Sequence, residues 1–406
     1  MRYGYFQDKQ KNIIDEITAV FMPEGNSFTG FDQVEIFCHG GQTVVNNILI
    51  ELLESNCRAA EPGEFTKLAF LSGRINLSEA EAVAEIIAAN TKHSYEVAKE
   101  HLLGGYSSII ESIKNKLISI IAEIEASIDF PEEEIDIKDR QSLLNSVDQI
   151  KSKISELISS YNGGKIIKEG YKIALAGKPN AGKSSLFNLL LKQERALVTE
   201  TPGTTRDYLS EWIDLDGYAV NIIDTAGIRK GGGKIEKAGQ ESAKNIIKKA
   251  DMVIWIVDIS QNNWSKQALQ DVNMIRHNNI IFVGNKIDLI GDKVSEAELD
   301  DKKLIKLSCK TGRGLKNLKN YIIDSISDNM PDFTSGVIVT SLRHQQKLKS
   351  AVKGLDKALE LIQISESPEL VAVELRAVAL SIDEITGKIY TEEILGKIFS
   401  SFCVGK

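Results

Sequence analysis

The sequence predicts a fold of mixed α/β and α class: a small α+β N-terminal domain, then a helical domain interrupted by an inserted α/β domain. Three observations support this. Short alternating runs and turn signals fill the first 70 or so residues, strands and helices alternate from 171 to about 327, and helical periodicity flanks that block. A chain of 406 residues is also too long for one compact core. The expected domains are residues 1–72, 73–169, 170–332 and 333–406, of which the second and fourth form the helical domain.

The first elements follow from local patterns. Gln33–Cys38 alternates like a strand, and Val44–Leu53 has a helical pattern. Apolar residues at i, i+3 and i+4 spacing predict helices within Asn76–Ile128 and a further helix over Leu143–Tyr161. The Gly163-Gly164 pair follows directly and is expected to stop that helix.

The central block predicts a largely parallel sheet, because short apolar runs alternate with helical patterns. The predicted strands are Ile173–Ala176, Ala219–Ile223, Met252–Val257, Ile280–Val283 and Leu304–Leu307. From Leu342 onward the chain becomes helical again. Helices before and after an α/β block indicate one helical domain with an insertion.

Composition argues against a dedicated nucleic-acid-binding protein, but it neither supports nor excludes RNA contact through a local patch or a partner. The net charge of −8 lacks the basic excess of a dedicated nucleic-acid-binding protein. No leader sequence or membrane-spanning apolar run is visible, so we expect a cytoplasmic protein without membrane contact. The four cysteines have no zinc-ligand spacing and are expected to be reduced thiols: Cys38, Cys57, Cys309 and Cys403.

A phosphate-binding loop lies between the first central strand and the next helix. Gly177–Ser184 matches G-x-x-x-x-G-K-[ST] in the strand-to-helix context that the motif requires. The glycines allow backbone N–H groups to surround phosphates at the positive end of a helix. Lys183 is expected to reach the β- and γ-phosphates, and the Ser184 hydroxyl to ligate Mg²⁺.

Three further motifs follow in order. Thr204-Thr205 lies in a loop where a threonine would complete the Mg²⁺ shell, and Asp224–Gly227 ends a strand near the metal and the γ-phosphate. Asn285–Asp288 ends another strand, where Asp288 can accept both N–H donors of guanine; adenine lacks the exocyclic amine, which disfavours ATP. With Ser308–Lys310 these motifs resemble those of Ras-like GTPases. The expected GTP contacts are Asn180, Ala181, Gly182, Lys183, Ser184, Ser185, Thr199, Glu200, Thr201, Pro202, Gly203, Thr204, Thr205, Asp224, Thr225, Ala226, Gly227, Asn285, Lys286, Asp288, Ser308, Cys309 and Lys310.

The group that orients the attacking water is not obvious. Ras-type enzymes place a Gln just after the D-x-x-G motif, but this chain has Ile228 there, which cannot polarise water. Beyond the glycines at 231–233, Glu236 is a candidate, although a carboxylate in the first turn of a helix can also be a solvated residue without a catalytic role.

The positive charge needed in the transition state is also open. Arg206 and Arg229 are candidates for an arginine finger, or they form surface ion pairs. A bound cation could supply the same charge, with oxygen ligands from Asn180 and the run Thr199–Thr204.

The whole chain resembles one family, the MnmE (TrmE) tRNA-modification GTPases. The resemblance rests on the inserted α/β domain and on short motifs along the chain. These are Asn26–Gly30, Pro62–Thr66, Asp129–Glu133, Pro179–Ala181, Gly203–Asp207 and Phe402–Lys406.

The resemblance implies a K⁺-dependent GTPase in which K⁺ replaces the arginine finger and two G domains associate across the nucleotide. The family's catalytic glutamate matches Glu236. Its Mg²⁺ ligands match Ser184 and Thr205, and its K⁺ ligands match Asn180, Thr199, Thr201 and Thr204.

The resemblance also implies a larger reaction. With the flavoprotein MnmG (GidA), family members install a carboxymethylaminomethyl group on the wobble uridine of tRNA, using a one-carbon unit from 5,10-methylene- or 5-formyl-tetrahydrofolate. They form homodimers, and with MnmG a heterotetramer is expected. The family's folate contacts match Glu35, Arg74 and Lys406, which by themselves would read as an edge-strand carboxylate, a loop arginine and a chain end.

The chain departs from the family pattern at Phe31, where an acidic residue is usual, and at Cys309, where alanine is usual. It also begins after a segment with which family members normally start, so the N-terminal domain is expected to be incomplete for folate binding and subunit pairing. Two alternatives follow. One is a ribosome-assembly GTPase of the Era or Der type, although no GXXG loop of an RNA-binding KH module is visible. The other is a GTPase unable to support modification.

Overall fold

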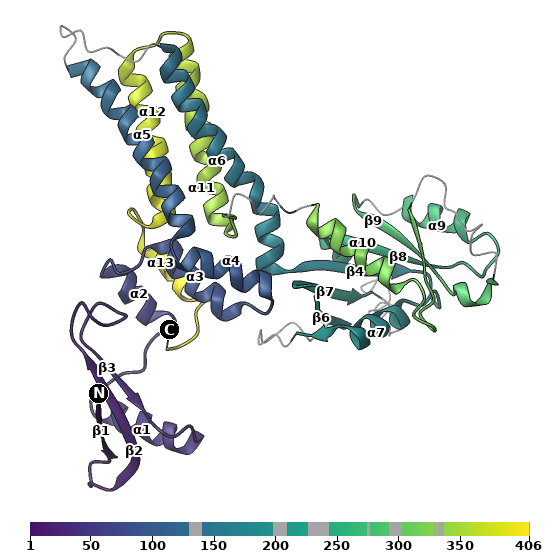
Figure 1. The fold of residues 1–406 in the computed structure, drawn as a ribbon, viewed down its shortest axis with the longest axis horizontal. Helices are drawn as coiled ribbons and strands as arrows, with labels where there is room; N and C mark the ends of the chain where they lie inside the picture. The colour runs from purple at the N-terminus through teal and green to yellow at the C-terminus, as the bar shows by residue number, and fades with distance from the viewer. Residues whose placement is uncertain are drawn as a thin grey trace, which may run out of the picture. The chain divides into compact units, whose positions relative to one another are not determined.

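The structure is a computed structural model that separates into two compact units. The first, here called the helical unit, comprises residues 1–88, 98–155 and 343–406, and the second, the α/β unit, comprises 89–97 and 156–342. The chain thus leaves the helical unit and returns to it, as expected for an inserted domain (Figure 1). The structure describes residues 1–129, 140–197, 209–225, 243–273, 277–291, 303–328, 330 and 337–405.

The N-terminal part of the helical unit is a three-stranded antiparallel sheet with a helix. The strand order is β1-β2-β3, and the predicted strand and helix are confirmed as β3 and α1. The two preceding strands had no separate prediction. The elements are β1 (Arg2–Gln7), β2 (Ile13–Met22), β3 (Gln33–Phe37), α1 (Gln42–Glu54) and α2 (Glu64–Leu71).

Long helices form the rest of the helical unit. α5 and α12 pack side by side along most of their length (Figure 1), and both bury an aliphatic stripe, such as Ile113 and Leu117 on α5 and Leu375 and Val378 on α12. The predicted helical stretch 76–128 is three helices rather than two. The helices are α3 (Leu77–Ala88), α4 (Lys92–Leu102), α5 (Gly105–Asp129), α6 (Arg140–Glu169), α11 (Leu342–Gln363), α12 (Pro368–Thr386) and α13 (Glu392–Phe399). The first part of α4 and the last part of α6 belong to the α/β unit. No helix within the described ranges is long and apolar enough to cross a membrane.

The predicted end of α6 at the Gly163-Gly164 pair is wrong, because the helix continues to Glu169. The structure gives Gly164 another role. A Cβ atom there would lie 2.2 Å from the carbonyl oxygen of Val339 and 2.7 Å from Ile338 Cγ2. The Val339 N–H also donates to Ser160 Oγ at 3.0 Å. Glycine therefore allows a second chain segment to pack directly on the helix backbone, and this outweighs its low helix propensity.

The α/β unit is built on a seven-stranded sheet with strand order β10-β9-β8-β4-β7-β6-β5. The five predicted strands are confirmed, and their pairings are parallel. The antiparallel pair β5 and β6 at one edge was not predicted. The strands are β4 (Tyr171–Gly177), β5 (Arg195–Ala196), β6 (Leu209–Leu215), β7 (Tyr218–Asp224), β8 (Met252–Asp258), β9 (Ile280–Asn285) and β10 (Leu304–Lys306).

Both faces of this sheet are covered (Figure 1). On β4, Ile173 and Leu175 join the core that includes α7 (Lys183–Gln193) and α10 (Leu315–Ser327). The alternate residues of β4 join the core that includes α9 (Trp264–Asn273) on the other face. This doubly covered parallel sheet places the loops after β4, β7, β8 and β9 at one edge, where ligands of such folds bind.

Candidate functional site

The phosphate-binding loop connects β4 to α7. Gly177 and Gly182 have φ values of +137° and +110°, which favour glycine. A Cβ atom on Gly182 would lie 2.0 Å from Asn285 Nδ2, so a side chain would also be excluded by contact. Lys183 Nζ folds back over the loop and donates to the carbonyls of Gly177 (2.9 Å) and Lys178 (2.7 Å). The ammonium group is thereby held over a loop that ends at a helix N-terminus, an arrangement that favours phosphate.

Two oxygen-bearing side chains meet beside this loop. Ser184 Oγ, in the first turn of α7, donates to Asp224 Oδ2 at 2.7 Å. Asp224 ends β7 and is fully buried, and the adjacent Thr225 Oγ1 donates to the Leu175 carbonyl at 2.7 Å. A hydroxyl and a carboxylate are ligands that suit Mg²⁺, which takes few protein ligands when phosphates are also present. The residues present therefore fit Mg²⁺.

The loops after β9 and β10 form the second half of the site. Asp288 lies in the short helix Ile287–Leu289, and Ser308 Oγ donates to its Oδ1 at 2.6 Å. This hydrogen bond holds the pKa of the Asp288 carboxyl below its ordinary value. The Ser308 hydroxyl also accepts from the Thr311 N–H at 3.2 Å. Asp288 is therefore an oriented, ionised acceptor.

Asn285 connects the two halves. Its Nδ2 donates to the Ala181 carbonyl at 2.9 Å, and its Oδ1 accepts from the Cys309 N–H at 3.0 Å. The residue is only 3% exposed. Asn285 is a predicted GTP-binding residue, and in the structure its amide bridges the phosphate-binding loop and the loop after β10.

Asp258 is a residue of this site that sequence reasoning missed. Its Oδ2 accepts from Lys286 Nζ at 2.6 Å. Burial would raise the pKa of Asp258, but hydrogen bonds from Lys286 and Ser260 outweigh it and lower that pKa. The available signal was an acidic residue at the end of an apolar strand. The ion pair fixes the side chain of Lys286, which lines the nucleotide pocket.

Both halves line one open pocket of about 1050 Å³. Its lining includes many of the predicted GTP contacts from the two halves. It adds Pro179, which lies in the predicted phosphate-binding loop but was not among the expected contacts, and Leu289, which sequence reasoning missed. Burial raises the pKa of the Cys309 thiol to about 12, so this side chain is a neutral wall of the pocket. The lining residues are Pro179, Asn180, Gly182, Lys183, Ser184, Ser185, Asn285, Lys286, Asp288, Leu289, Cys309 and Lys310.

Several predicted site residues lie outside the described part of the chain, and the structure says nothing of them. They include both arginine-finger candidates, the glutamate proposed to orient water and three of the four potassium ligands. They are Thr199, Glu200, Thr201, Pro202, Gly203, Thr204, Thr205, Arg206, Ala226, Gly227, Arg229, Glu236 and Lys406.

The other two folate positions lie in the N-terminal part of the helical unit. Glu35 is on β3 and accepts from Gln33 Nε2 at 3.1 Å. Arg74 follows α2 and donates from Nη1 to the Gly25 carbonyl at 3.1 Å. Arg74 therefore binds the loop that contains one of the family-like motifs.

Comparison with known proteins covers the whole chain. The family model of the TrmE N-terminus, described as a GTP-binding protein, matches residues 1–74, and that of the MnmE helical domain matches 77–403. The tRNA modification GTPase MnmE of Thermoanaerobacter sp. (strain X514) is 39% identical over 411 residues, covering 100% of this chain and 89% of that protein. MnmE of Aquifex aeolicus is 38% identical, covering 100% of this chain and 90% of that protein. Among solved structures, the G domain of the T. maritima FeoB iron transporter is 27% identical, covers 38% of this chain and 98% of that chain, and has a TM-score of 0.29.

The matches include the N-terminal part and the helical unit as well as the nucleotide motifs. The match to the MnmE helical-domain family model extends over most of the chain. The identity to the MnmE relatives extends along the full length of the chain. The chain belongs to the MnmE (TrmE) family of tRNA modification GTPases.

Proposed function

We propose that this protein is a GTP hydrolase that acts in tRNA modification. The observation that carries the proposal is the single pocket lined by both the phosphate-binding loop and Asp288. A phosphate loop alone would fit many nucleotides, whereas an oriented carboxylate on the facing loop selects guanine.

Each side chain of the pocket has a definite task in this proposal. The N–H groups at the start of α7 and Lys183 Nζ would bind the phosphates, and Lys183 would exchange its two carbonyl partners for phosphate oxygens. Ser184 and Thr205 would hold Mg²⁺, which when bound neutralises the charge on the phosphates. Asp288 would accept from the two N–H groups of guanine, with Ser308 fixing its orientation.

Hydrolysis would proceed as the resemblance to the family implies. Glu236 would orient the attacking water, since Ile228 cannot. The positive charge would come from K⁺ held by Asn180, Thr199, Thr201 and Thr204. Asn180 supports this assignment, because it lines the nucleotide pocket, where it has the left-handed conformation with φ +60°.

The wider reaction is proposed from family membership. With MnmG the protein would install carboxymethylaminomethyl at the wobble uridine of tRNA, with a tetrahydrofolate one-carbon unit bound by Glu35, Arg74 and Lys406. It would act as a homodimer within a heterotetramer, and its tRNA substrate would place it in the cytoplasm. The ranges 1–72, 73–169, 170–332 and 333–406 are proposed as its domains. An assembly-factor role of the Era or Der type would not require the matched N-terminal and helical segments.

The first test is GTP turnover by the purified protein in K⁺ and in Na⁺ at equal ionic strength, with Glu236→Ala as a control. Strong stimulation by K⁺ that the substitution abolishes is the expected result. Equal, slow turnover in both salts would contradict the cation mechanism. Addition of MnmG, tRNA and a reduced folate then tests the modification step, for which the expected product is modified wobble uridine. GTP turnover without any modified nucleoside would contradict the proposed tRNA modification, while the proposed GTPase activity would stand.

A further inference from the structure

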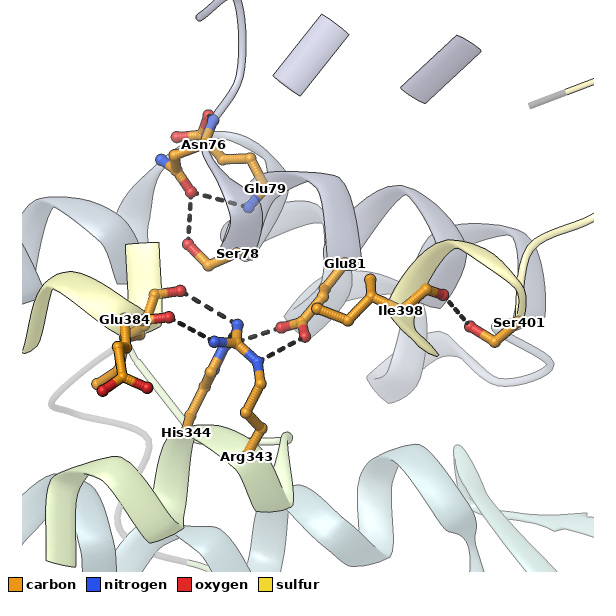
Figure 2. Close-up of polar contacts among 10 residues, drawn as sticks. Asn76, Ser78, Glu79, Glu81, Arg343, His344, Glu384, Ile398 and Ser401 are labelled. Carbon is orange, nitrogen blue, oxygen red and sulfur yellow. Dashed lines mark hydrogen bonds and ion pairs between the residues drawn. The ribbon is translucent and has the colours of Figure 1, made fainter. Parts of the chain in front are cut away.

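A buried group of charged and aromatic side chains lies in the helical unit, at the start of α11. Its centre is Arg343, His344 and Glu81, shown in Figure 2. Glu81 comes from α3, and the two adjacent basic residues open α11, directly after the chain returns from the α/β unit. His344 is 3% exposed. Buried charges are costly unless they are paired, so each contact in this cluster matters.

Arg343 holds the C-terminal end of α12. Its Nη1 donates to the Glu384 carbonyl at 2.6 Å and its Nη2 to the Ile385 carbonyl at 3.1 Å. These carbonyls belong to the last turn of the helix. Carbonyls in this turn have no hydrogen-bond partner within the helix and carry partial negative charge. Arg343 Nε also donates to Glu81 Oε1 at 3.1 Å. One guanidinium thus joins α11, α12 and α3.

His344 Nε2 has two competing neighbours. It lies 2.7 Å from Arg343 Nη2 and 2.8 Å from Glu81 Oε2. Arg343 can only donate, so Nε2 must be unprotonated to accept from it. Glu81 is an ionised acceptor, so Nε2 would have to be protonated to bond with it. One nitrogen cannot satisfy both neighbours at once.

The contact between His344 Nε2 and Arg343 requires one state of the imidazole. Within the described part of the chain, Glu81 Oε2 and His344 Nδ1 are both buried without a hydrogen-bond partner. A neutral His344 that accepts from Arg343 through Nε2 carries its proton on Nδ1, so neither the Nδ1–H group nor Glu81 Oε2 gains a partner. The state binds Arg343 firmly, yet it leaves two polar groups unsatisfied, at a cost that a change of protonation would relieve.

The surroundings favour the neutral form. Burial lowers the pKa of His344, and Arg343 and His101 act in the same direction, whereas Glu81 opposes them. Burial opposes the charge of Glu81, but His344 and Arg343 hold its pKa well below the ordinary value.

The remaining polar neighbours are also placed. Tyr106 of α5 stacks on His344 with ring centroids 5.1 Å apart, and His101 of α4 lies 3.8 Å from Glu85 of α3. Lys347, one turn further along α11, pairs with Glu384 of α12.

We propose that Arg343, His344 and Glu81 form an acid-sensitive clamp on the C-terminal end of α12. Neutral His344 accepts from Arg343 and keeps it on the α12 carbonyls. Protonation of Nε2 pairs His344 with Glu81 and turns a bond to Arg343 into a donor–donor repulsion, so the Nη2 group leaves Ile385. The proton enters from solvent and no bond between heavy atoms changes.

The clamp controls more than one helix end. α12 passes through Gly387, where a Cβ atom would lie 2.6 Å from Leu77 Cβ, into α13 and the chain end. There the Cys403 carbonyl accepts from the Gly63 N–H at 3.4 Å, and Pro62 pairs with Val404. Release of α12 would therefore loosen the segment that joins the chain end to the start of α2.

The test is amide hydrogen exchange of residues 384–402 in the full-length protein at pH 7.5 and pH 5.0, corrected for the intrinsic pH dependence of exchange. The variants are His344→Gln, whose amide oxygen can accept from Arg343 but cannot be protonated, and His39→Gln as a control, because His39 is an exposed histidine that pairs with Asp15. ¹⁵N chemical shifts of the imidazole nitrogens, assigned by comparison with the His344→Gln spectrum, report the protonated atom directly.

The expected result is a loss of protection of about tenfold or more between pH 7.5 and 5.0 in the wild-type protein and in His39→Gln, because the protonated fraction rises up to tenfold per pH unit. His344→Gln should keep its protection at both pH values. Equal losses in the wild-type protein and His344→Gln, or no loss in either, would overturn the proposal. So would ¹⁵N shifts that place the proton on Nε2 at pH 7.5.

Discussion

The bridge formed by Asn285 yields the most specific prediction about the nucleotide site. Asn285→Ala removes the donor to the Ala181 carbonyl and the acceptor of the Cys309 N–H. Each of these backbone groups would be left in a nearly dry site, at a cost of about 1–3 kcal/mol. The total free-energy cost is about 2–6 kcal/mol. It should weaken nucleotide binding, because binding needs the two loops to stay together. If only the lower bound appears in binding, the Kd for GDP rises about 30-fold.

The assay is binding of a fluorescent GDP analogue, measured together with the thermal unfolding midpoint. Asn279→Ala is the matched control, because Asn279 precedes the same strand, β9, at its other end. Its Nδ2 donates to Tyr171 Oη at 3.0 Å and to the Asp251 carbonyl at 3.1 Å. Both substitutions should lower the unfolding midpoint, but only Asn285→Ala should weaken nucleotide binding. Equal affinities in the two variants would refute the assignment of Asn285 as the connection between the loops.

Three further predictions concern single side chains. Gly164→Ala should destabilise the protein by about 1–3 kcal/mol in denaturant unfolding, because the new methyl group meets a packed backbone and this outweighs the gain in helix propensity; a more stable variant would refute the close-approach argument. Ser308→Ala should raise the pKa of Asp288 towards its ordinary value, since it removes the hydrogen bond that lowers it. GDP binding, which needs the ionised carboxylate, should then fail at a higher pH than in the wild-type protein, and unchanged acid midpoints would contradict this. Cys309, with its raised pKa, should react with iodoacetamide at pH 8 far more slowly than the exposed Cys57, and comparable rates by mass spectrometry would show that the thiol is not buried as described.

The parts of the site that sequence reasoning located are those in which one short segment dictates its own backbone. The turn at Gly182, the start of α7 at Lys183 and the position of Asp288 after an apolar strand all follow from local chemistry. The five parallel strands were found for the same reason, because each is a short, mainly apolar run in a sheet that helices cover on both faces.

The parts that were missed depend on contacts between segments distant in sequence. Asp258 belongs to the site only because β8 and β9 pair in parallel and bring it to Lys286. Gly164 looked like a helix stop because its partner, Val339, is far away in the chain. Arg343 lies in a segment with a helical pattern, and that pattern does not predict its ion pair with Glu81 on α3. Local periodicity predicts elements, whereas such roles arise from packing.

The central claim is that Asp288 selects the base in a pocket that the phosphate-binding loop completes. The most direct measurement compares the Kd values of GTP and XTP for the wild-type protein and for Asp288→Asn. Xanthine has a carbonyl oxygen where guanine has its exocyclic amine. The amide of Asn at position 288 can donate to the xanthine oxygen, but it cannot accept from both N–H groups of guanine as the carboxylate does. The wild-type protein should prefer GTP by about a hundredfold or more, and the variant should prefer XTP. A variant that keeps the preference for GTP would show that Asp288 does not read the base.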